Sequence, residues 1–294
     1  MCALLLFTSF PHTDSKVTAA VPVPTGNTAL INDDFNGVTD ATVTKSTSPV
    51  TTVAGYKPTI TGENSSVGIT QSGMDGGEAV TSDALLLKDL DGKNSSSQIV
   101  GDGSGYTAIT KSLGENVKDG ILTIEQDMYF FGDTTVLNGT NDISRGRTVL
   151  RLSGGLNDEN RSSDILLQVD LKNARIAWRD STGVYTNITP DKVSNGVWYH
   201  LKAVVNFATL RVDYSVTKAS DGTMLGELGG QRLSLQTLGD APTDFAVAKT
   251  YLATTGGSTA QNLLLDNIIV YKPNTLPDAP VWESLTPYDS KVKL

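Results

Sequence analysis

The sequence of 294 residues has very little of the chemistry that most enzyme and metal sites use. It contains one cysteine, Cys2, and two histidines, His12 and His200. Cys2 lies in the predicted leader, and the mature chain would then have no cysteine for a disulfide, a thiolate nucleophile or a cysteine-based metal site; a zinc site has too few ligands. No apolar run approaches the roughly 18 residues that span a bilayer. No amphipathic helical pattern of about 10 residues occurs either.

Basic runs are also missing. Lysine and arginine total 23, aspartate and glutamate total 32, and the net charge is −9. A nucleic-acid-binding protein normally carries a basic patch or stripe, and an acidic surface repels anionic membranes at long range. We therefore expect neither nucleic-acid binding nor membrane insertion. The acidic balance still allows a local arginine to bind an acidic sugar.

Threonine, serine, asparagine and glycine dominate the polar residues, a composition that suits short strands joined by many turns. Apolar and polar residues alternate clearly over 122–131, 198–205 and 210–216. The pair Asn195-Gly196 is the strongest single turn signal. Strand patterns recur about every 8–15 residues, which predicts a sandwich or a barrel rather than βαβ units. Periodicity alone does not decide between sandwich and barrel.

The ends of the chain differ in composition from its middle. A short apolar run within residues 1–20, ending in Val17-Thr18-Ala19-Ala20, predicts a truncated signal peptide and hence a secreted protein. Residues 21–29 and 273–281 are proline-containing linkers. They bound one domain over 30–272. Residues 282–294 are too short to fold alone.

Four short segments together resemble the laminin-G-like members of the concanavalin A-like lectin/glucanase superfamily. They are residues 195–201 (Asn-Gly-Val-Trp-Tyr-His-Leu), 210–214 (Leu-Arg-Val-Asp-Tyr), 33–35 (Asp-Asp-Phe) and 265–268 (Leu-Asp-Asn-Ile). In that superfamily the last two are the first and last strands, paired in one sheet. The resemblance implies an all-β, two-sheet antiparallel jelly-roll sandwich, concanavalin A-like, over about 30–272.

The resemblance also implies a modular extracellular protein. Such domains occur as accessory modules of secreted bacterial pectate lyases and other polysaccharide-degrading enzymes. Residues 277–280 and 290–294 are similar to the start of a fibronectin type III module. We therefore expect a monomeric module within a longer chain.

Catalytic groups of the related enzymes are incomplete in this chain. Jelly-roll glucanases carry a Glu-x-Asp-x-x-Glu strand, and Glu125-Gln126-Asp127 lacks the third carboxylate. The Gln-x-His strand of jelly-roll alginate lyases is absent. His200 is expected to pack within its strand, and Trp198 to lie in the core. We therefore assign no catalytic residue.

Four neighbouring residues are the candidates for carbohydrate binding: Trp178, Arg179, Asp180 and Tyr185. Sugar rings stack on aromatic faces. Their hydroxyls accept hydrogen bonds from arginine and donate hydrogen bonds to carboxylates. The first three stand at a predicted strand end, and Tyr185 follows across the next turn. The alternative is a core tryptophan with a solvated Arg–Asp pair.

A structural Ca²⁺ ion is the expected cofactor, if there is one. Asp33, Asp34 and Asp266 would meet if the first and last strands pair, and carboxylate oxygens suit this cation. The alternative for each aspartate is turn or cap chemistry. No organic cofactor is expected.

Three functions follow for testing. The favoured hypothesis is a non-catalytic carbohydrate-binding module of a secreted polysaccharide-degrading protein, possible ligands being polysaccharides or oligosaccharides. The first alternative is a polysaccharide lyase or glycoside hydrolase acting itself, which requires His200 to point away from the core. The second is an adhesive or spacer domain of the cell surface.

Overall fold

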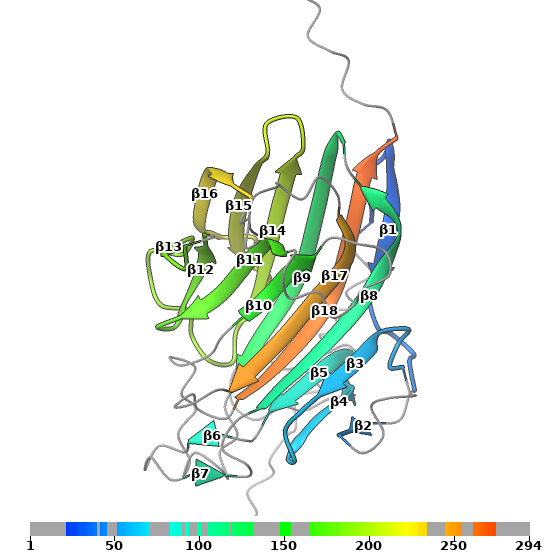
Figure 1. Cartoon of the computed structure of the whole chain (residues 1–294), viewed down its shortest axis with the longest axis vertical. Helices are drawn as coiled ribbons and strands as arrows, with labels where there is room; N and C mark the ends of the chain where they lie inside the picture. The colour runs from blue at the N-terminus through cyan, green and yellow to red at the C-terminus, as the bar shows by residue number, and fades with distance from the viewer. Residues whose placement is uncertain are drawn as a thin grey trace, which may run out of the picture.

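The computed structural model describes residues 22–39, 42–45, 52–70, 83–89, 92–93, 99–100, 105–117, 119–131, 148–153, 165–180, 182–233, 245–254 and 261–274. Within these ranges the chain forms eighteen strands and no helix, and each strand pair is antiparallel. None of the described segments is a helix long and apolar enough to cross a membrane. Two large sheets stack face to face (Figure 1).

The nine-stranded sheet has the order β16-β15-β14-β9-β18-β5-β4-β2, and β1 also pairs with β18. Its members are β1 (Asn27–Asp33), β2 (Val43–Thr44), β4 (Ser65–Thr70), β5 (Ala84–Asp89), β9 (Ile121–Phe131), β14 (Trp198–Asn206), β15 (Arg211–Lys218), β16 (Met224–Arg232) and β18 (Gln261–Pro273). The long strand β18 pairs with β9 along one edge, and β5 and β1 share its other edge. Strands β9 and β18 therefore lie at the centre of this sheet.

The seven-stranded sheet has the order β13-β12-β11-β10-β17-β8-β3. Its members are β3 (Lys57–Ile60), β8 (Gly105–Val117), β10 (Thr148–Ser153), β11 (Ile165–Lys172), β12 (Arg175–Arg179), β13 (Tyr185–Asn187) and β17 (Phe245–Thr254). Strands β6 (Gly92–Lys93) and β7 (Ile99–Val100) form a separate pair. Since consecutive strands of the chain cross between the two large sheets, the topology is that of a jelly roll rather than of two separate meanders.

The core lies between the sheets because each strand sends alternate side chains inward. Leu122, Ile124, Met128 and Phe130 of β9 belong to the same buried cluster as Leu167, Val169 and Leu171 of β11. The predicted all-β, two-sheet antiparallel jelly-roll sandwich is confirmed. In the centre of the nine-stranded sheet, the side chains at odd positions of β9 are left facing outward.

The first and last strands pair as the sequence predicts. Asp33 of β1 lies opposite Ile268 of β18, and Asn27 lies opposite Pro273. The last three residues of the linker predicted over 21–29 belong to β1. The first residue of the linker predicted over 273–281 belongs to β18. The predicted signal peptide (1–20) and the predicted fibronectin-like start (282–294) lie outside the described residues.

Candidate functional site

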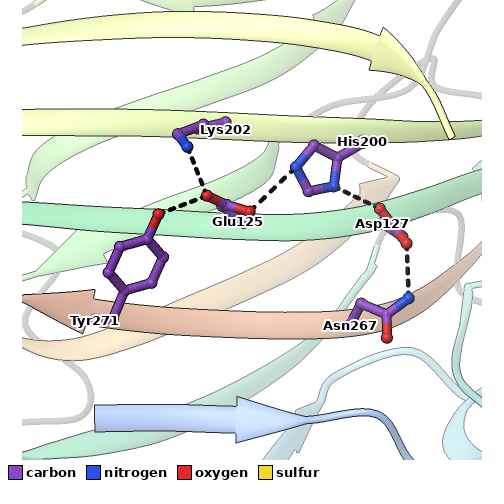
Figure 2. A network of polar contacts seen from close by, with 6 residues as sticks. All are labelled: Glu125, Asp127, His200, Lys202, Asn267 and Tyr271. Atoms are coloured by element: carbon purple, nitrogen blue, oxygen red, sulfur yellow. Dashed lines mark hydrogen bonds and ion pairs between the residues drawn. The ribbon is translucent and has the colours of Figure 1, made fainter. Parts of the chain in front are cut away.

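Six polar side chains form one connected network on the outward face of the nine-stranded sheet. They come from three adjacent strands: Glu125 and Asp127 from β9, His200 and Lys202 from β14, and Asn267 and Tyr271 from β18 (Figure 2). Because side chains two apart on a strand share a face, each strand supplies a pair or a spaced set to this side. On β14 the intervening residue, Leu201, faces the core.

Strand register brings these side chains into contact. In the β14–β9 pairing, His200 lies opposite Asp127 and Lys202 lies opposite Glu125. Each basic residue thus stands across from an acidic one, and opposite charges at directly paired positions are favourable. On the other side of β9, Tyr271 of β18 reaches Glu125 diagonally from its position opposite Thr123.

His200 is held between two carboxylates. Its Nδ1 lies 2.7 Å from Asp127 Oδ1, and its Nε2 lies 3.3 Å from Glu125 Oε2. An ionised carboxylate only accepts hydrogen bonds, so both ring nitrogens must donate, and this requires the charged imidazolium. Burial opposes the charge, but the hydrogen bonds and negative charges of Asp127 and Glu125 outweigh it and raise the pKa of His200 to about 9.

Glu125 is the most heavily bonded member of the network. Its Oε1 accepts hydrogen bonds from Lys202 Nζ and from the Tyr271 hydroxyl, both at 2.8 Å. Its side chain is 9% exposed, and burial by itself would raise the pKa. The hydrogen bonds from His200, Lys202 and Tyr271 prevail and lower the pKa of Glu125 to about 2. The carboxylate is therefore ionised at every pH at which a folded protein is normally used.

Asn267 enters the network through an irregularity in β18. The register of the β18–β9 pairing shifts between Asp266 and Ile269, and Asn267 has a φ of 49°. Asparagine adopts this left-handed conformation more readily than most residues. The bulge aims the Asn267 amide at Asp127, where its Nδ2 donates to Oδ2 at 2.8 Å. Both carboxylate oxygens of Asp127 are thereby fixed in position.

The network pairs opposite charges. Two carboxylates face one imidazolium and one ammonium, and a third carboxylate, that of Asp266, stands opposite Asp127 in the β18–β9 pairing. Burial lowers the pKa of Lys202, but its hydrogen bond to Glu125 and the charge of that carboxylate raise it overall. Burial and Glu125 both raise the pKa of Tyr271, which keeps its hydroxyl protonated.

Aromatic residues continue the same face beyond Asp127. Trp198, Tyr129 and Phe131 lie on the outward side of β14 and β9, and the Trp198 and Tyr129 ring centroids are 5.3 Å apart. The prediction that Trp198 lies in the core is wrong. It shares the outward face with His200 and Lys202, is partly exposed, and packs on a small apolar cluster outside the main core.

The four residues predicted to bind carbohydrate lie on the other sheet, and the structure divides them. Trp178 is 8% exposed and belongs to the main core, so its ring is not available as a stacking platform. The Asp180 carboxylate accepts hydrogen bonds from Thr182 and from the Val184 amide, which is turn chemistry. Arg179 and Tyr185 do meet, on the outward face, with Arg179 Cζ 5.7 Å from the ring centroid.

The three aspartates predicted to bind calcium do not converge. Asp33 points between the sheets, where its carboxylate accepts from Lys111 Nζ at 2.6 Å and from the Tyr56 hydroxyl at 2.8 Å. Asp266 lies opposite Asp127 in the β18–β9 pairing, and Asp34 accepts from the Asn36 amide.

The physical reason is strand alternation: pairing the first and last strands joins their backbones, yet it sends Asp33 and Asp266 to opposite sides of the sheet. A lysine ammonium in direct contact with Asp33 does not fit a cation site. Within the described part of the chain, no group of three or more histidine, cysteine or acidic side chains is placed to hold a metal. Calcium binding stays a prediction.

Sequence reasoning named Glu125 and Asp127 only as an incomplete catalytic motif, and it did not name Lys202, Asn267 or Tyr271 as functional residues. A signal for one of them was present. In 198–205 the apolar residues occupy the odd positions, so the even positions carrying Trp198, His200 and Lys202 must face outward together. The contribution of β18 had no comparable signal, because a bulge creates it.

Comparison with known proteins gives structural likenesses only. No protein-family model matches the chain, and no curated protein matches its sequence. The endo-1,3-beta-glucanase from Streptomyces sioyaensis is similar at 12% identity and a TM-score of 0.47, covering 87% of this chain and 100% of that chain. Lectin II from Ulex europaeus is similar at 10% identity and a TM-score of 0.42, covering 76% and 93% respectively.

The catalytic domain of the glycoside hydrolase family 131 protein from Coprinopsis cinerea is similar at 11% identity and a TM-score of 0.39, covering 68% of this chain and 71% of that chain. Glucanases and lectins with jelly-roll sandwiches thus stand among the structures that resemble this chain. Likenesses this distant carry no inference about what the chain binds or cleaves.

Proposed function

We propose that this chain is a non-catalytic carbohydrate-binding module whose ligand lies on the outward face of β9, β14 and β18. The observation that carries the proposal is the six-residue polar network beside a partly exposed Trp198 on the same face. A sugar presents hydroxyls to a row of fixed donors and acceptors, and C–H faces to an aromatic ring. This face offers both within one patch.

The network is prepared for binding before a ligand arrives. The side chains of His200 and Lys202 are 22% and 39% exposed, and Asp127 and Glu125 hold both in place. The Lys202 ammonium has three N–H donors, and its contacts with Glu125 and Tyr271 leave at least one for a ligand. Side chains already fixed lose little conformational entropy on binding, which favours affinity.

The protonation states support binding rather than cleavage. Hydrolysis by a carboxylate pair needs one protonated carboxylic acid as the proton donor, whereas the pKa of Glu125 is about 2. Proton abstraction by a lyase needs a neutral base, whereas His200 is an imidazolium over the neutral range. Glu125 and His200 are thus held in forms that do not suit these two steps.

The enzyme alternative retains one observation in its favour. His200 points outward beside Asp127 and Glu125, where a substrate could reach it, rather than into the core. A polysaccharide lyase or hydrolase acting through this face is therefore the second candidate. Secretion, a monomeric state and a polysaccharide-degrading parent protein of pectate lyase type stay predictions from the sequence.

A glycan screen with variants tests the proposal. Wild type, Trp198→Ala and Lys202→Gln are compared by affinity electrophoresis against neutral and acidic polysaccharides, while new reducing ends and unsaturated uronates are assayed on the same samples. Lys57→Gln is the matched control for Lys202→Gln, because Lys57 lies on β3, an edge strand of the seven-stranded sheet.

We expect retardation of wild type and of Lys57→Gln on at least one polysaccharide without product formation. Losing a hydrogen bond from a charged donor corresponds to about tenfold weaker binding, which is the result expected for Lys202→Gln. Thermal unfolding of each variant checks that the fold is intact. Product formation would establish the enzyme alternative, and equal retardation of all four proteins would show that the ligand lies elsewhere.

A further inference from the structure

The opposite side of the sandwich carries a second group of chemically distinctive residues. Lys172 of β11 lies opposite Arg175 of β12, and Arg179 of β12 lies opposite Tyr185 of β13. On β12, Ile176 and Trp178 point to the other side, into the core, whereas Ala177 lies on the same face as the two arginines. Strand alternation therefore sends three cationic side chains and one aromatic side chain to the outward face of the seven-stranded sheet.

Tyr185 organises this group. Its hydroxyl donates to Asp170 Oδ2 at 2.9 Å, which fixes the ring across the sheet. Lys172 Nζ lies 5.1 Å from the ring centroid, and Arg179 Cζ lies 5.7 Å from it. Both distances fall within the range of cation–π attraction, so one ring gathers two cations. The cations are thus positioned by an uncharged group rather than by a carboxylate.

These cations keep their charge uncompensated. Among the residues that the structure describes, neither Lys172 nor Arg179 has a hydrogen bond or an ion pair, and Arg175 donates its Nε to the Pro190 carbonyl. The carboxylate of Asp170 on this face is buried and accepts from Gln168 and Tyr185. The strands β11, β12 and β13 therefore place three positive charges and one buried carboxylate on this face, in a chain whose net charge is −9.

We infer that the face formed by β11, β12 and β13 binds an acidic polysaccharide through the carboxylates of its uronate residues. Arg175 and Arg179 are four residues apart on one strand, a separation of about 13 Å at 3.3 Å per residue. A row of that length suits an extended chain with repeated acidic groups better than one small anion. Guanidinium groups bind carboxylates in a bidentate geometry, with two parallel hydrogen bonds.

The number of cations argues against nucleic acid. Duplex binding usually uses six or more phosphate contacts, of the order that a basic stripe supplies. Three cations on an acidic protein suit a polymer of lower charge density, such as a polyuronate. The site is independent of the polar network on the nine-stranded sheet, because it lies on the other outward face and shares no residue with it.

The double variant Lys172→Gln/Arg179→Gln tests the inference in the full chain. Polygalacturonate binding is measured by affinity electrophoresis and by calorimetry at low and high salt. The control, Lys45→Gln/Lys57→Gln, removes two exposed lysines near β2 and β3, away from β13. Binding to a neutral glucan is read in parallel, and Lys202→Gln on the other face separates the two sites.

We expect the double variant to bind polygalacturonate at least about tenfold more weakly, since it loses two charged donors. The control pair and Lys202→Gln should bind it as wild type does, and affinity should fall with salt. Three results would overturn the inference: no polygalacturonate binding by wild type, equal weakening in the control pair, or equally tight binding of single-stranded DNA or polyglutamate. Loss of neutral-glucan binding in Lys202→Gln alone bears only on the function proposed for the other face.

Discussion

Raising the pH from about 6 to about 10 should destabilise this protein through one residue, His200. Its pKa is about 9 in the folded chain and 6.5 ordinarily. That difference, at about 1.36 kcal/mol for each pKa unit, corresponds to about 3 kcal/mol. The side chain is 22% exposed, and the solvent screens part of the interaction. We therefore expect a loss of about 2 kcal/mol in the free energy of unfolding.

The direction follows from a folded-state pKa above the unfolded one. The folded chain retains the proton that the unfolded chain releases, so the stabilisation is complete below pH 6.5 and is lost as the pH rises through about 9. The pKa values of Lys202 and Tyr271 are raised from their ordinary values of 10.5 and 10.0, so these two neighbours of His200 in the network titrate above this window.

Urea unfolding followed by tryptophan fluorescence, repeated across this pH range, measures the effect. The sequence has one other histidine, His12, so His12→Gln is the matched control. Wild type and His12→Gln should lose stability with rising pH, and His200→Gln, although less stable throughout, should lack that slope. Contributions from groups other than His200 are common to both proteins and cancel in the comparison. A flat wild-type profile, or the same slope in His200→Gln, would refute the charged-histidine geometry.

Three further predictions follow from single contacts. The pKa of Glu125 is lowered from 4.5 to about 2, so the ionised carboxylate stabilises the fold fully above pH 4.5, and this stabilisation is lost as the pH falls through about 2. Urea unfolding in acid should show this loss in wild type and not in Glu125→Gln. Trp178→Ala should lower the free energy of unfolding by about 3–5 kcal/mol through a core cavity while leaving neutral-glycan affinity unchanged, as denaturation and affinity electrophoresis would show. Gly226→Ala would place a Cβ 2.1 Å from the Ile188 carbonyl oxygen, so the strands must shift and calorimetry should show a loss of about 1–3 kcal/mol.

Most of the fold that could be predicted from the sequence was predicted from the alternation of apolar and polar residues in its strands. The patterns over 122–131, 198–205 and 210–216 match β9, β14 and β15 closely. Strand β16 was not predicted, because three glycines interrupt its alternation and most of its side chains are at least partly exposed. Its position is set by pairing with β15 rather than by an apolar face of its own. Edge strands of this kind leave little trace in a single sequence.

The two tryptophans show where the reasoning from sequence failed. The alternation that predicted their strands also fixes which face each side chain takes. Trp178 shares its face with Ile176, whereas Ala177 faces outward. Trp198 shares its face with His200, whereas its neighbour Tyr199 faces the core. For Trp178 the alternative of a core tryptophan is confirmed, whereas the prediction of a core Trp198 is wrong, because a position at the end or start of a strand does not tell which face a side chain takes.

The polar network itself could not be read from the sequence, for a different reason. Two-residue spacing places Glu125 with Asp127 and His200 with Lys202, but it does not say that the two pairs meet. Their contact depends on the antiparallel register of β14 against β9, which joins residues 73 positions apart. Asn267 joins through a bulge whose position no pattern reveals. Long-range register and local irregularity are the two features that a single sequence specifies least.

Stability alone does not explain well why four charged side chains lie at the centre of a sheet. Removing carboxylates and ammonium groups from water costs much of what their pairing returns, and apolar replacements of similar volume are often neutral or stabilising. The same face packs Tyr129, Phe131 and Leu264 as an apolar cluster, so such residues fit there. A chain under no other demand could extend that cluster across β9. The retained network, partly exposed at His200 and Lys202, is the arrangement that the proposed recognition of a polar ligand would need.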